Sequence, residues 1–236
     1  VATVTGNTIT IVGAGLTTIT ASQAGNATFN PAPNVNQTLS VNKANQTITF
    51  NTLAAKTFGD AAFTVSATST SGLPITFSSA NTTVATASGS TVAIISAGSA
   101  NITASQSGNS NYNAASDINR SLTVNKASQT ITFDALPSKS FNDAPFTLTG
   151  FSSSGLAISY SSSNTSVATV SGSTVTILAQ GSTTISASQT GNINYAAASN
   201  VNRVLTVNGL QSQTISFNSI GDKTIGDLPF FLNASA

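Results

Sequence analysis

Ten residues of this chain occur twice with a single change. VNKANQTITF occupies residues 41–50, and VNKASQTITF occupies residues 124–133, 83 positions later. The same offset aligns VATVTGNTITIVGAGLTTITASQAGN at 1–26 with similar segments that begin at Val84 and at Val167. Near-identical segments at constant spacing indicate a tandem repeat, in which each unit is one structural module. We therefore expect an array of modules rather than one large domain.

The repeat predicts how the chain divides into domains. Residues 1–43 are expected to form the C-terminal part of one repeat, 44–126 and 127–209 two complete repeats, and 210–236 the N-terminal part of a further repeat. Both ends of the sequence fall inside a repeat. We therefore expect the chain to be a section of a longer protein, to which the overall function belongs.

Apolar and polar residues alternate within each repeat. In TVTIL, Val175 and Ile177 share one face of the segment, while Thr174 and Thr176 share the other. A period of two predicts half-buried strands, and Gly-containing turn signals separate these segments about every 8 to 12 residues. The pattern predicts an all-β fold of tandem immunoglobulin-like β-sandwiches, with about seven strands in each repeat of about 83 residues. The strands expected in the first complete repeat are residues 46–50, 62–68, 74–79, 83–87, 90–96, 99–106 and 119–125.

The duplicated ten residues mark the seam between two repeats. Val124 closes one repeat and Ile131 opens the next, at an odd separation that places their side chains on opposite faces of a continuous strand. The segment is therefore expected to pass from one core to another. Because the connection is short, we expect a stiff array. The third seam has Gly209 where the earlier seams have lysine, together with one extra residue, so we expect a kinked or more flexible joint there.

The chain carries little charge and few reactive side chains. Charged residues make up 6% of it, the formal net charge is +1, and His and Cys are absent. Nucleic-acid binding needs a basic patch, which this composition does not supply, and the apolar runs are too short to insert into a membrane. Without His, Cys or Glu the usual catalytic pairs are missing, so we expect no enzyme activity, no metal site and no cofactor.

One recurrent motif has the pattern K-x-[FI]-x-D-x-x-F. The aspartates could supply oxygens to calcium, and a lysine near Asp and Asn could form an isopeptide crosslink. Calcium wants six to eight oxygens, and each repeat offers too few. We favour a tight turn in which the aspartate accepts backbone N–H groups. The residues expected in this turn are Lys56, Asp60, Lys139, Asp143, Lys223 and Asp227.

A second recurrent motif reads Gly-Asn-x-x-aromatic and falls in the long loop between the last two strands of a repeat. Loops of this kind gather at one end of a sandwich, where binding sites are common. The aromatic ring could stack on a sugar, or it could seal the end of the domain against its neighbour, and we favour the second interpretation. The candidate binding residues are Asn109, Tyr112, Asn192 and Tyr195.

The segment NTSVATVSGSTVTILAQGSTTISAS at 164–188 resembles bacterial Ig-like domains of the Big type. The wider cycle, with KSFNDAPF, GNINYAAAS and LTVNKASQTITF, resembles tandem arrays in very large secreted surface proteins of Bacteroidota, including gliding-motility adhesins exported by the type IX system. This resemblance implies an extracellular protein attached to the bacterial outer surface, with an adhesive or filamentous role.

The expected partners are neighbouring repeats of the same chain, other copies in a filament, and extracellular surfaces or glycans. Nucleic-acid binding and membrane insertion are not expected. Two alternatives remain open at this point. One is a multivalent module that binds glycans or a host surface, and the other is a spacer in a large secreted enzyme.

Overall fold

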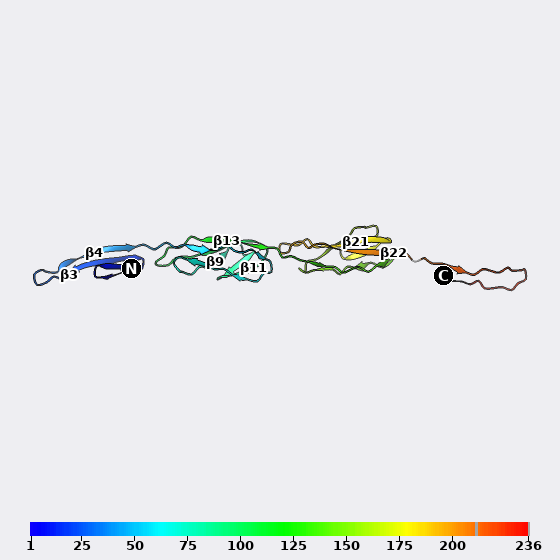
Figure 1. The fold of residues 1–236 in the computed structure, drawn as a ribbon, viewed down its shortest axis with the longest axis horizontal. Coiled ribbons are helices and arrows are strands. Elements are labelled where there is room, and N and C mark those ends of the chain that lie inside the picture. Colours follow the sequence, from blue (N-terminus) through cyan, green and yellow to red (C-terminus); the bar gives the residue numbers. More distant parts are fainter. Residues whose placement is uncertain (211, 236) are drawn as a thin grey trace. The chain divides into compact units, whose positions relative to one another are not determined.

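The chain forms strands joined by turns and loops. The computed structural model describes residues 1–210 and 212–235, which Figure 1 colours from blue to red along the sequence. It divides into two compact units, Val1–Ser128 with Asn192–Ala196, and Gln129–Gly191 with Ala197–Ala236. The short segment Asn192–Ala196 therefore packs with the first unit, although it lies far along the sequence.

The first unit contains a complete repeat that is built from short, mostly antiparallel strands. β6, β13, β12 and β9 form one sheet in that order, β10, β11 and β7 form a second, and β5 pairs with β8. β6 and β13 are parallel, with Lys56 opposite Val124. The strands are β5 (Ile48–Phe50), β6 (Lys56–Thr57), β7 (Phe63–Thr64), β8 (Ala67–Ser69), β9 (Thr76–Ser79), β10 (Ala85–Ser88), β11 (Thr91–Ile94), β12 (Gly98–Ser105) and β13 (Ile118–Asn125).

The second unit repeats this topology. β15, β22, β21 and β18 form the four-stranded sheet, β16, β20 and β19 the three-stranded sheet, and β14 pairs with β17. The strands are β14 (Ile131–Thr132), β15 (Lys139–Ser140), β16 (Phe146–Thr147), β17 (Phe151–Ser152), β18 (Ser159–Ser162), β19 (Ala168–Ser171), β20 (Thr174–Ile177), β21 (Gly181–Ser188) and β22 (Val201–Asn208).

The partial repeats at the two ends form hairpins. β1 (Ala2–Thr5) pairs with β2 (Thr8–Ile11), and β3 (Gly15–Gln23) pairs with β4 (Ala32–Val41). Near the C-terminus β23 (Ser216–Phe217) pairs with β24 (Ala234–Ser235). Several large apolar side chains on these hairpins are exposed, as at Leu16 and Phe231.

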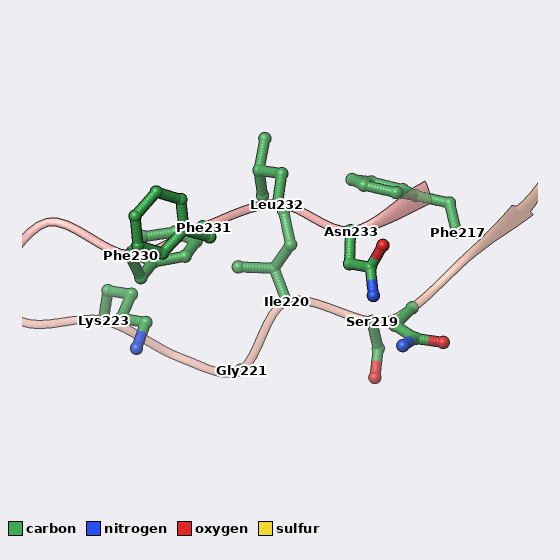
Figure 2. A pocket seen from close by; sticks show the side chains of 10 residues that line it. Phe217, Ser219, Ile220, Gly221, Lys223, Phe230, Phe231, Leu232 and Asn233 are labelled. Atoms are coloured by element: carbon green, nitrogen blue, oxygen red, sulfur yellow. The ribbon is translucent and has the colours of Figure 1, made fainter. Parts of the chain in front are cut away.

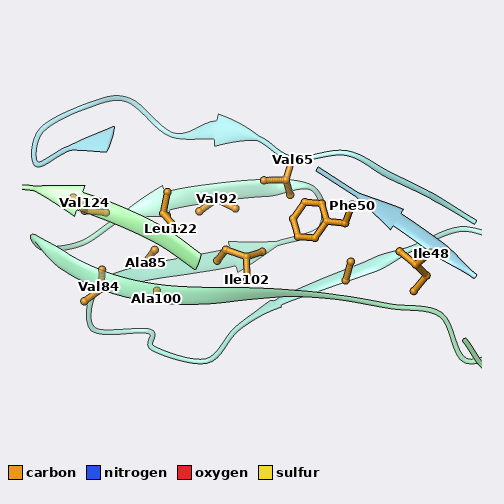
Figure 3. Packing of buried hydrophobic residues seen from close by; sticks show 11 residues of the cluster. Ile48, Phe50, Val65, Val84, Ala85, Val92, Ala100, Ile102, Leu122 and Val124 are labelled. Atoms are coloured by element: carbon orange, nitrogen blue, oxygen red, sulfur yellow. The ribbon is translucent and has the colours of Figure 1, made fainter. Parts of the chain in front are cut away.

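A hydrophobic core fills the space between the sheets of the complete repeat. Ile102 on β12, Leu122 on β13 and Val92 on β11 each have 0% of their surface exposed. Figure 3 shows their side chains pointing toward one another together with Phe50 and Val65. Because the inward residues alternate with exposed ones along β13, each strand contributes one face to the core. The predicted all-β sandwich fold is confirmed.

The strand pattern differs from the expected one in two places. A single strand was expected over residues 62–68, but β7 pairs with β11 whereas β8 pairs with β5, so this segment changes sheets between them. The two-residue strand β6 was not expected at all, because two residues are too few to show a period. With these changes the structure has nine short strands within 44–126, from β5 to β13, rather than about seven.

The backbone passes from one core to the next at the seam, as the odd separation of Val124 and Ile131 predicts. Leu122 and Val124 belong to the core of the first unit, whereas Ile131 and Phe133 belong to the core of the second. The backbone thus changes cores within a few residues, and each complete repeat buries its own apolar side chains. Stability in such arrays is a sum of repeat stabilities and nearest-neighbour terms.

Truncation of Leu122 to alanine should destabilise the repeat 44–126, since the side chain is fully buried between the sheets. We expect Leu122→Ala to lower its free energy of unfolding by about 2–5 kcal/mol. Urea titration, with hydrogen exchange of peptides from this repeat, measures the loss. The control Thr123→Ala, on the exposed face of the same strand, should cost less than about 1 kcal/mol. Equal losses for the two variants would contradict this description of the core.

Candidate functional site

The Gly-Asn-x-x-aromatic segments adopt one conformation in all three copies. We call residues 25–29, 108–112 and 191–195 the tip loops. In the second tip loop the Oδ1 atom of Asn109 accepts hydrogen bonds from the backbone N–H groups of Asn111 and Tyr112, at 2.8 and 2.9 Å. The Asn109 N–H in turn donates to the carbonyl of Tyr112, at 3.0 Å. Such asparagine turns fix a loop without any tertiary partner.

Each tip loop begins with a glycine, because the backbone at the end of the loop turns back against this residue and leaves no space for a side chain. Gly108 has a φ of 76°, and a Cβ atom added there would lie 2.4 Å from the carbonyl oxygen of Tyr112. Gly25 and Gly191 have φ values of 76° and 77°. A larger residue would therefore meet both an unfavourable dihedral angle and a backbone clash.

A buried pair of glutamines holds the base of the tip loop. Gln46 Nε2 donates to Gln106 Oε1 at 2.5 Å and to the carbonyl of Asn113 at 2.7 Å. Gln106 Oε1 also accepts the N–H of Gly108 at 2.5 Å. Both glutamines are 7% exposed, so their amides are hydrogen-bonded within the protein rather than to bulk water. Gln129 and Gln189 make the same bond, at 2.6 Å, in the second unit.

Each tip loop in a complete repeat binds the seam that leads into that repeat. Ala44 donates its N–H to the carbonyl of Asn111 at 2.8 Å and accepts the N–H of Asn113 at 2.9 Å. Ala127 makes the matching pair with Asn194 and Ala196, both at 2.9 Å. These contacts form short parallel bridges, Ala44 to Tyr112 and Ala127 to Tyr195. The seam is therefore hydrogen-bonded to a loop and is not a free linker.

The tip of the loop reaches beyond the seam into the preceding repeat. Asn194 Oδ1 accepts the N–H of Ala97 at 2.9 Å, over a separation of 97 residues. Asn111 Oδ1 accepts the N–H of Ala14 at 2.9 Å, over the same separation. The asparagine side chain of the tip loop thus accepts a hydrogen bond from the backbone N–H of the residue just before a long strand of the preceding repeat.

An aromatic contact accompanies the hydrogen bond of the third tip loop. The ring of Tyr195 meets Phe58 edge-on, with centroids 5.6 Å apart and planes at 80°, and Lys126 Nζ donates to the Asn192 carbonyl at 2.6 Å. All of these residues lie within the first compact unit. Edge-to-face aromatic pairs contribute about 0.5–1.5 kcal/mol beyond their buried area. We call the surface that receives this loop the socket, and its residues are Phe58, Ala97, Lys126 and Ala127.

The structure places the four candidate binding residues in roles within the protein. Asn109 and Asn192 use their side-chain oxygens to form the loop itself. Tyr112 and Tyr195 are half-buried, and Tyr195 contacts Phe58. The ring contact of Tyr195 with Phe58 is of the kind that the sealing interpretation predicts, and glycan binding stays a prediction. The contacts of Asn111 and Asn194 were not foreseen. Their signal is the second asparagine in GNSNY and GNINY, which GNATF lacks.

The Lys-Asp motif forms a turn in each of its three copies. Asp60 Oδ2 accepts the N–H of Thr57 at 2.9 Å, and the Asp60 N–H donates back to the Thr57 carbonyl at 3.0 Å. Asp143 and Asp227 make the same pair of bonds with Ser140 and Thr224. The carboxylate is thus used as a backbone acceptor, which is the arrangement that the turn interpretation expects.

The lysine of this motif has a role that the sequence did not suggest. Lys56, Lys139 and Lys223 place Nζ 4.7, 4.8 and 4.6 Å from the ring centroids of Phe63, Phe146 and Phe230, respectively. Cation–π contacts at exposed positions contribute about 0.5–1 kcal/mol. Figure 2 shows the third copy, where the Lys223 side chain lies beside the Phe230 ring. The pocket of about 200 Å³ drawn there is lined only by exposed residues of one hairpin segment.

The Gln180 side chain lies against Gly209, at the position that Lys126 holds in the preceding repeat. A Cβ atom at Gly209 would lie 2.2 Å from Oε1 of Gln180, so the Gln180 side chain occupies the space that a lysine stem would need. Gln180 itself stands where Ala97 stands in the preceding repeat. The kinked or flexible joint expected at Gly209 stays a prediction, and Gln211 of the same seam lies outside the described residues.

Within residues 1–210 and 212–235, no three acidic side chains gather into a group able to hold a metal ion. The same residues contain no helix of the length and apolarity needed to cross a membrane.

Comparisons with known proteins give distant likenesses in structure alone. No protein-family model matches the chain, and no curated protein matches it. The chain is similar to surface layer protein SbsC, domains 1–6, with a TM-score of 0.31, 16% identity and 89% of this chain covered. It is also similar to Drosophila N-cadherin EC1–4, with a TM-score of 0.34, 10% identity and 82% covered. For protocadherin gammaB7 EC3–6 the values are 0.35, 12% and 89%.

The chain spans 37%, 57% and 62% of the lengths of these three structures. Because the likenesses are low, the description of the fold as tandem β-sandwiches depends on the sheets and cores of the chain itself.

A substitution of the tip-loop glycine should disrupt the loop more than positive φ alone explains. We expect Gly108→Ala to destabilise the repeat 44–126 by more than about 1 kcal/mol beyond the matched variant Gly72→Ala. Gly72 has a φ of 73° but no heavy atom within 4 Å of an added Cβ. Thermal unfolding and hydrogen exchange at Ala44 measure the difference. Equal destabilisation by the two variants would show that the return of the Tyr112 carbonyl is not the cause.

Proposed function

We propose that this chain is the structural repeat region of a bacterial cell-surface adhesin or filament, and that its repeats form a stiff extended stalk. The observation that carries the proposal is the contact of a tip loop with the preceding repeat. It occurs twice with the same chemistry, Asn111 with Ala14 and Asn194 with Ala97, each 97 residues apart. A contact repeated at the period of the array joins neighbours wherever the array continues.

The hydrogen bonds at a seam give this proposal its physical basis. Around the second seam four hydrogen bonds connect the loop to its surroundings: Ala97 to Asn194, Ala127 to Asn194, Ala196 to Ala127, and Lys126 to Asn192. Each contributes about 0.5–1.5 kcal/mol net. Bending at the seam would require breaking several of them together, whereas a free linker would bend at no such cost.

The surface of the chain fits a passive extracellular element. Charged residues are 6% of the sequence, so stability should depend little on ionic strength. Location at the bacterial outer surface, and the narrower role in gliding motility with type IX export, are supported by the sequence resemblance alone. Because His, Cys and Glu are absent, we assign no catalytic role to this chain.

Stiffness at the second seam should depend on the tip loop. We expect the double variant Asn194→Ala with Tyr195→Ala to broaden the distribution of distances between labels in 44–126 and 127–209, measured by single-molecule FRET. The reason is the loss of the hydrogen bond to Ala97 and the ring contact with Phe58.

The control Ile193→Ala lies in the same loop, is 66% exposed, and should leave the distribution unchanged. Circular dichroism verifies that both repeats remain folded. If the wild-type chain already gives the broad distribution of the double variant, the stiff stalk is refuted.

The cellular role has its own test. Antibodies against the repeat 44–126, used for immunogold electron microscopy of intact source cells, should label thin surface filaments along their length. Label that appears only in released soluble material would contradict a surface stalk and would favour a secreted protein in which the repeats act as spacers.

A further inference from the structure

An asparagine stands at the end of the last strand in three successive repeats. Asn42, Asn125 and Asn208 lie 83 residues apart, each follows a valine, and each is exposed. Lysine follows the first two of them, whereas Gly209 follows the third, so that Asn208–Gly209 is the only Asn-Gly pair in the sequence. The three seams therefore present the same side-chain amide, but only the third presents it beside a glycine.

This asparagine stays exposed where the tip loop of the following repeat is docked. Asn125 is exposed although the next residue, Lys126, donates from Nζ to the carbonyl of Asn192 in the docked loop at 2.6 Å. Asn42 is exposed although the nearby Ala44 is hydrogen-bonded to the tip loop 108–112. A docked tip loop thus leaves this position accessible to water, and we expect the same at Asn208.

The backbone of Asn208 is paired on one side only. The pairing of β22 with β21 ends at Val207, opposite Gly181. The parallel pairing of β22 with β15 ends one residue later, where Ser140 lies opposite Asn208. The Phe141 N–H donates to the Asn208 carbonyl at 2.9 Å. Strand ends open locally at a small fraction of the free energy of global unfolding, so Asn208 can leave the extended conformation while Val207 stays in the core.

Gly209 supplies a backbone nitrogen that no side chain shields. Without a Cβ atom, the backbone at this residue also reaches conformations that other residues rarely adopt. The Gln180 side chain occupies the space that a Cβ atom would take, so a larger residue at 209 would have to displace it. The packing of this seam is thus compatible with the residue that leaves the preceding amide most open to attack.

We infer that Asn208 is a site of spontaneous covalent modification, at which the side-chain amide is lost through attack by the backbone nitrogen of Gly209. This nitrogen gives up its proton and forms a bond to Cγ of Asn208, while the side-chain nitrogen takes a proton and leaves as ammonia. The product is a five-membered imide. Water then adds to one of the two imide carbonyl carbons, and the bond from that carbon to the ring nitrogen breaks as the nitrogen regains a proton.

The two products change the seam in different ways. Opening at Cγ gives aspartate, which lowers the formal net charge of the chain from +1 to 0. Opening at the main-chain carbonyl carbon gives isoaspartate, in which the main chain is one carbon longer. The carbonyl that accepts the Phe141 N–H then becomes a free carboxylate outside the main chain, so the pairing of β15 with β22 should loosen. This inference concerns the chemistry of one seam and goes beyond the proposed stalk.

Peptide mapping of the full chain by mass spectrometry, after incubation in neutral buffer and digestion at acidic pH, tests the inference. The peptide that contains Asn208 should gain about 1 Da and separate into two products on chromatography. Asn125 is the control within the same molecule, because it is exposed and its carbonyl accepts the Phe58 N–H at the same 2.9 Å. We expect Asn208 to react roughly tenfold faster than Asn125, or more, because glycine follows it.

Two variants separate the cause from the consequence. Gln180→Ala combined with Gly209→Lys gives the third seam the residues of the second, and should lower the rate at Asn208 to that of Asn125. Asn208→Asp adds the charge without lengthening the main chain. Hydrogen exchange at the Phe141 N–H should therefore be faster in the isoaspartate fraction of the wild type than in Asn208→Asp.

Three outcomes would overturn the inference. Asn208 could react no faster than Asn125 in the folded chain. The double variant could react as fast as the wild type, which would exclude Gly209 as the cause. Modification could also occur in urea but not in buffer, which would show that the end of β22 does not open in the folded protein. None of these outcomes bears on stiffness at the second seam, so the inference and the proposed stalk can fail separately.

Discussion

A buried hydrogen bond between two glutamine side chains determines how each complete repeat is joined to its surroundings. Gln46 belongs to the first residues of a repeat and Gln106 to the base of its tip loop, and their amides meet at 2.5 Å. Each amide has further partners, Asn113 and Gly108, so both ends of the pair are satisfied. A buried amide left without such partners would be costly, which makes the arrangement specific. The pair thus ties the start of the repeat to the base of its tip loop.

The fold was largely accessible from the sequence because it depends on local periodicity. Ile102 and Leu122 lie on alternating segments, and both are fully buried where the period of two places them. The change of core across the seam followed from the odd spacing of Val124 and Ile131. The parallel strand β6 did not, because Lys56 and Thr57 pair with a segment that arrives much later in the chain.

The candidate site was accessible only in part, for a related reason. The sequence identified the tip loops and the Lys-Asp turns, whose shapes depend on side chains a few residues apart. It did not identify Asn111 or Asn194 as the residues that reach the preceding repeat, since that contact joins atoms 97 residues apart. Nor did it foresee the lysine over the phenylalanine ring, because alternation predicts the face of a residue but not which side chain of another strand it contacts.

The segment Asn192–Ala196 packs with the first unit, although the strands on either side of it belong to the second. A chain that emerges from its N-terminal end can close the sandwich of residues 44–126 long before that segment appears. The backbone N–H of Ala97 donates to Asn194 Oδ1, which lies 97 residues further along the chain. Because synthesis runs from the N-terminus, the core of residues 44–126 can form before the Asn194 side chain that accepts the hydrogen bond from Ala97 has been made. The contact between neighbouring repeats therefore forms later in synthesis than the core of the repeat that receives it.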